Sequence, residues 1–205
     1  MDGSSSNRRK LLDRRLLYTQ HMMLRSGSRI ALTVVTLLVA AVSANAAAGC
    51  WQGVKHYNRG VDLQDKGDLD GAIGEYRTSM GQCSTFWRPV YNLGTVLQAK
   101  GDIEGAIAQY RGVISEWPHI WQAHLALGNI LEDKGEHEAA LVEYRAVIKR
   151  RKKEPEAHYG LGRALQATGD LQGAIMEYRA AIRLRPNYPE AQSAIAAALK
   201  SSDKS

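Results

Sequence analysis

Residues 155–188 read PEAHYGLGRALQATGDLQGAIMEYRAAIRLRPNY, and the same pattern occurs four times between Gly53 and Tyr188. Three kinds of residue recur every 34 positions: Gly60, Gly94, Gly128 and Gly162; Ala72, Ala106, Ala140 and Ala174; Tyr76, Tyr110, Tyr144 and Tyr178. Self-similarity at a fixed period of this length is typical of proteins that stack one helical hairpin on the next.

Each copy predicts two amphipathic helices joined by a short turn. In the fourth copy the helices are expected near Glu156–Ala167 and Leu171–Leu184, with small and apolar residues on one face of each. Gly169 is expected to end the first helix in the left-handed conformation, and Asp170 to cap the second. Because one hairpin cannot bury its apolar side alone, the copies are expected to stack.

The copies resemble the tetratricopeptide repeat family, with Leu and small residues early, Ala midway, an aromatic residue four positions later, and Pro near the end of two copies. The resemblance implies an all-α fold: a right-handed α-solenoid of four helix hairpins and a C-terminal capping helix, preceded by a hydrophobic leader helix. In the capping helix, the side chains expected to face inward are Ala191, Ile195, Ala196 and Leu199. The predicted segments are repeats at 53–86, 87–120, 121–154 and 155–188, a capping helix at 189–200 and a tail at 201–205.

The first 48 residues have the pattern of a targeting segment. Residues 1–29 are basic and polar, residues 30–48 are apolar, and Ala44-Asn45-Ala46 has the small-x-small form of a signal-peptidase site. This predicts export to a periplasm, an organelle lumen or the exterior, or retention by residues 30–48 as a membrane anchor. A lipid anchor on Cys50 is a further alternative. A start at Met22 or Met23 would shorten the basic segment to an ordinary length.

The net charge of +6 comes mainly from this leader. Residues 1–46 hold seven Lys or Arg and two acids, which leaves 27 − 7 = 20 basic and 21 − 2 = 19 acidic residues elsewhere. A balance of +1 removes the main electrostatic reason to expect nucleic acid as a partner. The one dense run, Lys149–Lys153, is expected to be a solvated helix end. The alternatives are a contact with acidic lipid or an acidic partner, or a nuclear-localisation patch, against which the leader argues.

The two cysteines, Cys50 and Cys83, flank the end that the two helices of the first repeat share. A disulfide between them is therefore plausible, and an oxidising compartment would permit it. Two free thiols, or lipidation of Cys50, are the alternatives.

The resemblance implies a concave groove lined by the first helix of each repeat, here called the A helix. The ligand expected there is a peptide or protein segment, because Tyr provides flat contact area and amide groups can pair with an extended backbone. Tyr as a common filler at its position is the alternative. Asn92 is the one residue that matches the chaperone-tail clamp of a known subfamily. The candidate binding residues are Tyr57, Gln64, Arg88, Tyr91, Asn92, Thr95, Gln98, Gln122, Asn129, Tyr159, Arg163 and Gln166.

The sequence contains no motif that predicts catalysis, a metal or a cofactor. His56, His124 and His158 share one repeat position and are expected to pack rather than bind metal, because neighbours one repeat apart cannot share an ion unaided. The predicted function is a non-catalytic scaffold that binds a protein segment and supports assembly of a complex. A self-associating structural solenoid and a regulatory subunit of an envelope enzyme are the alternatives.

Overall fold

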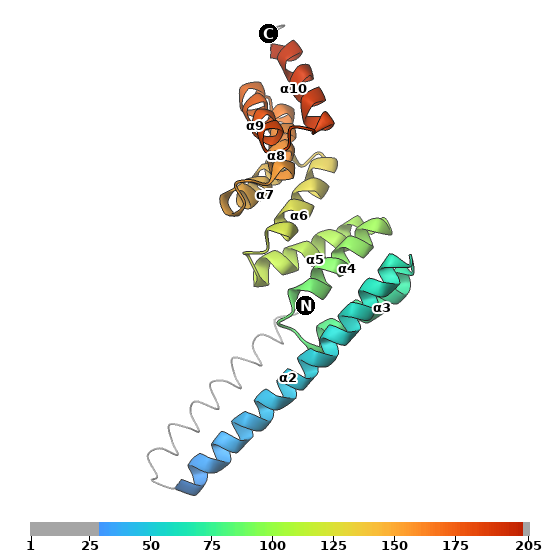
Figure 1. Cartoon of the computed structure of the whole chain (residues 1–205), viewed down its shortest axis with the longest axis vertical. Helices are drawn as coiled ribbons and strands as arrows, with labels where there is room; N and C mark the ends of the chain where they lie inside the picture. The colour runs from blue at the N-terminus through green and yellow to red at the C-terminus, as the bar shows by residue number, and fades with distance from the viewer. Residues whose placement is uncertain (1–28, 203–205) are drawn as a thin grey trace. The chain divides into compact units, whose positions relative to one another are not determined.

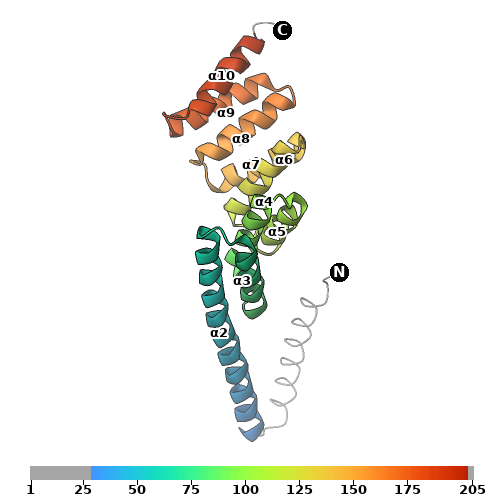
Figure 2. The same ribbon diagram turned by 90° about the vertical axis from the view of Figure 1, so that its right-hand side faces the viewer.

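The computed structural model describes the backbone of residues 29–202, and the side chains of residues 48–200 together with Thr36 and Ala40. The basic segment at 1–28, with the alternative starts at Met22 and Met23, and the last three residues lie outside this range. The described residues form nine α-helices and no strand (Figures 1 and 2), which confirms the all-α prediction. The chain divides into two units, Met1–Gln52 and Gly53–Ser205.

Helix α2 (Arg29–Asp65) contains the described part of the first unit and the A helix of the first repeat. Among the residues whose placement is described, no helix has both the length and the apolar character that crossing a membrane requires. Cys50 in α2 and Cys83, which follows α3, are both disulfide-bonded, and the described residues hold no free cysteine.

The second unit is a solenoid in which the helices after α2 follow one another in chain order, each packed against the one before it (Figure 1). Their bounds are α3 (Leu69–Gln82), α4 (Trp87–Ala99), α5 (Ile103–Glu116), α6 (Trp121–Asp133), α7 (His137–Arg150), α8 (Pro155–Ala167), α9 (Leu171–Leu184) and α10 (Pro189–Ser202). The A helices α4, α6, α8 and α10 therefore alternate with α3, α5, α7 and α9, here called the B helices.

Each hairpin turns at a glycine with positive φ, and Gly169 has φ 93°, as predicted. The Asp170 carboxylate then accepts a hydrogen bond from the backbone N–H of Gly173 at 2.8 Å and caps α9. A Cβ at Gly173 would lie 2.3 Å from that carboxylate, so this cap needs glycine three residues later. The third repeat has Glu136 and Ala139 instead, and Glu136 makes no side-chain cap.

The core is a continuous row in which each repeat's tyrosine lies against a glycine of its own A helix. All four tyrosines are buried: Tyr76, Tyr110, Tyr144 and Tyr178. A Cβ at Gly162 would lie 2.6 Å from the Tyr178 ring, which confirms that the glycine allows the two helices to approach closely. Gly160 has the same relation to Tyr144 of the preceding repeat, at 2.4 Å, so glycine also sets the spacing between the last two repeats.

The prediction for α10 was partly wrong. Ala191 and Ala198 are buried and Ile195 packs on the core, but Ala196 and Leu199 are exposed. The buried face follows the helical steps through Ala191, Ile195 and Ala198, which turn Ala196 and Leu199 outward. Ala196 occupies the position that Gly162 has in α8, and no B helix follows α10 among the described residues.

Candidate functional site

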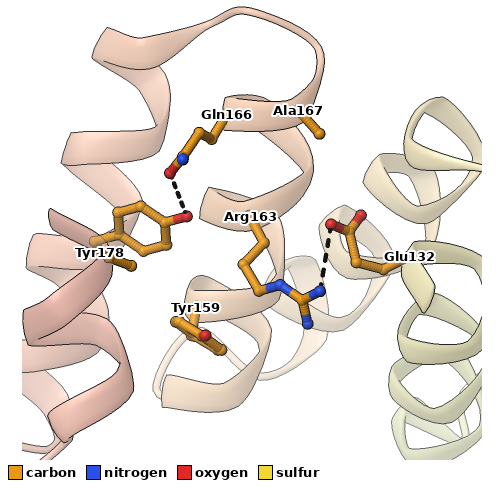
Figure 3. A pocket seen from close by; sticks show the side chains of 7 residues that line it. Glu132, Tyr159, Arg163, Gln166, Ala167 and Tyr178 are labelled. Atoms are coloured by element: carbon orange, nitrogen blue, oxygen red, sulfur yellow. Dashed lines mark hydrogen bonds and ion pairs between the residues drawn. The ribbon is translucent and has the colours of Figure 1, made fainter. Parts of the chain in front are cut away.

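Two adjoining hollows lie along the A helices of the third and fourth repeats, and they share Tyr159 and Arg163. One, drawn in Figure 3, has a volume of about 320 Å³ and is lined by Glu132, Tyr159, Arg163, Gln166, Ala167, Tyr178 and Ala194. The other has a volume of about 350 Å³ and is lined by Gln98, Asn129, Asp133, Tyr144, Glu156, Tyr159, Gly160, Arg163 and Tyr188. These volumes are at the small end of the range for binding sites, so each hollow suits side chains better than a large cofactor.

Tyrosine rings line both hollows. The Tyr159 ring lies between those of Tyr178 and Tyr188, with centroid distances of 5.9 and 5.2 Å. The Tyr178 hydroxyl donates to Gln166 Oε1 at 3.0 Å (Figure 3), and burial raises the pKa of Tyr178 to about 12. Tyr178 therefore stays neutral at physiological pH and keeps the proton that it donates to Gln166.

In the third repeat the core tyrosine does not donate to a glutamine, and this difference gives the site its charge. The glutamine that accepts from the core tyrosine in the other repeats is replaced by Glu132, and Tyr144 donates instead to Asn129 at 2.8 Å. The side chain of Glu132 is only 4% exposed. Its Oε2 lies 2.9 Å from His137 Nδ1, and its Oε1 lies 3.8 Å from Arg163 Nη2 (Figure 3).

Arg163 is thus the charged centre of the site. Its guanidinium group also lies 3.8 Å from Asp133, while the side chain remains 42% exposed. A buried carboxylate is stable only with compensating partners, so Glu132 holds Arg163 over the groove between α6 and α8. The site consequently offers a cation, an exposed carboxylate and an aromatic face within one stretch of the groove.

Five of the predicted binding residues line these hollows, and the rest do not. The five are Gln98, Asn129, Tyr159, Arg163 and Gln166. Tyr57 and Tyr91 are half-buried and pack against the core tyrosines of their own repeats, with ring centroids 6.0 and 5.5 Å apart.

The remaining predicted residues take part in local contacts. Gln64 accepts from the Tyr76 hydroxyl at 2.7 Å, and the Asn92 amide donates to the same hydroxyl at 3.3 Å. Thr95 donates to the backbone carbonyl of Asn92 at 2.7 Å. Arg88 lies over the Trp87 ring at 5.3 Å, and Gln122 is half-buried at the start of α6.

Comparison with known families agrees with the repeat structure. A family profile described as "Tetratricopeptide repeat" matches residues 91–146, and another described as "TPR repeat" matches residues 128–169 and 163–202. Together they cover the chain without a gap from residue 91 to residue 202. This chain belongs to the tetratricopeptide repeat family. Family membership supports a protein-interaction scaffold, and proteins of this family are generally non-catalytic.

Solved structures show the same fold at low sequence identity. MamA from Desulfovibrio magneticus RS-1, solved from residue 41 to the end, is 20% identical with a TM-score of 0.69, over 74% of this chain and 86% of that one. Another MamA crystal structure is 24% identical with a TM-score of 0.66, over 70% and 84%. A tetratricopeptide repeat protein from Parabacteroides merdae is 19% identical with a TM-score of 0.68, over 75% and 61%. No curated protein matches the sequence significantly.

The candidate residues of this tetratricopeptide repeat protein omit two core tyrosines and Asp133, which line the hollows. Glu132 and Glu156 lie at groove positions by the repeat register but were not among the candidates either. Tyr144 and Tyr178 are absent from the candidate binding residues, although Tyr178 lines the first hollow and Tyr144 lines the second. The sequence contained a usable signal, because a glutamine precedes the core tyrosine by 12 residues in every repeat but the third. No comparable difference between the repeats points to Asp133.

The three histidines stabilise the tetratricopeptide hairpins. His56, His124 and His158 each place Nδ1 2.6 Å from Oε2 of a glutamate on the following B helix; these glutamates are Glu75, Glu143 and Glu177. The hydrogen bond that His158 donates to the Glu177 carboxylate raises the pKa of His158. In the second repeat the corresponding residues are Val90 and Gln109, so both members of the pair are replaced together. No cluster able to hold a metal ion occurs in the part of the chain that the structure describes.

Proposed function

We propose that this protein is a non-catalytic scaffold that binds a peptide or protein segment in its concave groove, and that the third and fourth repeats hold the segment's side chains. The observation that carries this proposal is the pair of adjoining hollows that share Tyr159 and Arg163. Binding there would support assembly of a larger complex.

The polar groups of the site suit an extended segment. Gln166 uses its Oε1 to accept from Tyr178, which leaves its amide N–H groups to donate to a backbone carbonyl of a partner. Arg163 adds a second donor and Asp133 an acceptor, while Tyr159 offers a flat ring for an apolar or planar side chain. This mixture matches the alternating donors, acceptors and side chains of a peptide.

We also propose that the protein is exported or membrane-anchored. The basic segment, the apolar residues 30–48 and the small-x-small sequence at Ala44–Ala46 support this location. The disulfide-bonded state of Cys50 and Cys83 fits an oxidising compartment. Mapping the N-terminal peptide of native protein tests the proposal: a new N-terminus near residue 47 indicates cleaved export, and a membrane fraction retaining residues 30–48 indicates an anchor. Recovery of the intact chain in the soluble cytosolic fraction would contradict both.

The groove is tested by crosslinking the native partner, identifying it by mass spectrometry, and measuring its binding to purified variants. Tyr159→Ala combined with Arg163→Gln should weaken binding at least tenfold, because both residues line both hollows. Arg111→Gln on the B helix α5 is the matched control, since Arg111 lies outside the groove and should leave affinity unchanged. Equal binding by the double variant and the wild type would refute the groove as the binding site.

Self-association is a second candidate, favoured by exposed apolar residues on α10. Ala196 and Leu199 are apolar and exposed on α10, and Leu199 is 41% exposed. A second chain could cover this face. Light scattering that finds a monomer at micromolar concentration would refute this candidate, whereas a dimer that Leu199→Lys dissociates would support it.

A further inference from the structure

The B helices carry four ordered rows of exposed residues. On each helix, positions spaced by four, three and four residues point outward, and the same positions recur in every repeat. From the N-terminal end of the helices, the rows are Asp70, Glu104, Glu138 and Gln172; Gly74, Ala108, Val142 and Met176; Arg77, Arg111, Arg145 and Arg179; Gly81, Ser115, Lys149 and Arg183. The exposed surface therefore changes from acidic to basic along α3, α5 and α7, and from neutral to basic along α9.

The third row is arginine in all four repeats. None of these four guanidinium groups forms an ion pair or hydrogen bond with another residue in the described ranges. The core does not require arginine at an exposed position, so the row is available for contacts outside the chain. In the sequence, each arginine of this row directly follows the core tyrosine of its repeat, so a Tyr-Arg pair recurs every 34 residues.

The last two repeats add apolar and further basic side chains to this row. Val142 and Met176 are 63% and 65% exposed, where the first two repeats have only Gly and Ala. Lys149 and Arg183 replace Gly and Ser in the fourth row. We define these six residues of α7 and α9 as the outer patch: Val142, Arg145, Lys149, Met176, Arg179 and Arg183.

The charge of the outer patch is not neutralised by its own helices. Glu143 and Glu177, which belong to α7 and α9, are turned toward His124 and His158 and hydrogen-bonded there. Glu138 is the one exposed carboxylate in line with the patch on these two helices, one turn away. The exposed run from Arg150 to Lys153 extends the positive surface beyond the end of α7.

We propose that the outer patch binds the surface of an anionic phospholipid bilayer, an inference that rests on the envelope or membrane location proposed above. The rows follow the repeat direction, so a flat surface can contact several of them together. Val142 and Met176 can enter the headgroup region while the guanidinium groups bind lipid phosphates. Nucleic acid would match the cations but provides no apolar region for the two aliphatic side chains.

The test compares binding of the full chain to phosphatidylcholine vesicles with and without phosphatidylglycerol. The neutral vesicles report any binding by the apolar leader. Arg145→Gln with Arg179→Gln should reduce the affinity for anionic vesicles about 25-fold, because each cation near an anionic surface contributes about fivefold, or about 1 kcal/mol. Arg77→Gln with Arg111→Gln makes the same charge change in the same row and should have a much smaller effect. Val142→Ser with Met176→Ser should weaken binding without changing charge.

Three results would overturn the proposal: equal affinity for the two vesicle types, equal loss in the two arginine pairs, or displacement of the vesicles by a duplex oligonucleotide. The last would assign the patch to nucleic acid. Partner capture by the groove should be unaffected by the Arg145 and Arg179 variants, so failure of this inference is distinguishable from failure of the proposed scaffold function.

Discussion

Replacing Gly162 by alanine tests the close packing of the hairpins directly. The added Cβ would lie 2.6 Å from the Tyr178 ring and 3.2 Å from the Ala174 carbonyl oxygen, and real Cβ contacts of 2.6 Å do not occur. Tyr178 is buried and donates to Gln166, so a shift of the ring would disturb both its packing and that hydrogen bond. Overpacking of this kind costs about 1–3 kcal/mol, and replacing glycine inside a helix returns about 1 kcal/mol.

Gly74→Ala is the matched control, because it makes the same change within a helix and nothing lies within 4 Å of the added Cβ. It should stabilise the protein by about 0.5–1 kcal/mol through helix propensity alone. The propensity contribution cancels between the two variants, so their difference isolates overpacking and should be about 2 kcal/mol.

The measurement is unfolding by urea, followed by circular dichroism, with the midpoints of both variants compared with wild type. Gly162→Ala should unfold at lower urea concentration and Gly74→Ala at higher. Gly128→Ala, whose Cβ would lie 3.0 Å from Tyr144, should be less destabilised than Gly162→Ala. If Gly162→Ala were as stable as Gly74→Ala, the glycine row would not set the distance between the helices.

Three further predictions concern caps, a buried carboxyl group and the cysteines. Asp170→Ala should destabilise by about 1 kcal/mol, whereas Glu136→Ala should change urea stability little, because Glu136 makes no side-chain cap. Burial and the nearby Glu156 raise the pKa of Glu154 to about 7, so its ionisation should lower the free energy of unfolding as pH rises from about 4.5 through 7. Glu154→Gln should therefore raise the melting temperature above pH 7 and leave it unchanged near pH 4, as measured by thermal unfolding at the two pH values. Cys50 and Cys83 should resist alkylation until they are reduced, as measured by intact mass. Reduction should lower the free energy of unfolding by about 3–4 kcal/mol. Alkylation of both thiols without reductant would refute the disulfide.

Much of the fold could be predicted because its signals are local and repeated. The glycine turns and aspartate caps depend on residues that are near neighbours in the chain, and the Gly162–Tyr178 contact recurs within every repeat. The face of α10 was predicted less well, because the prediction copied the register of the earlier A helices, each of which packs against a following B helix. Ala196 illustrates this: it keeps a core position of the repeat but is exposed.

The sequence by itself determined the hairpins, their number and their order, since a 34-residue period with caps and small residues is typical of stacked helical hairpins. The tertiary structure alone decided which of the predicted side chains meet in one site, and which other side chains join them. In the third repeat Tyr144 donates to Asn129 and not to residue 132, so the Glu132 carboxylate can pair with Arg163. These contacts join residues from the A and B helices of one repeat to the A helix of the next. Such contacts depend on how each repeat is rotated on its neighbour, which no local pattern specifies.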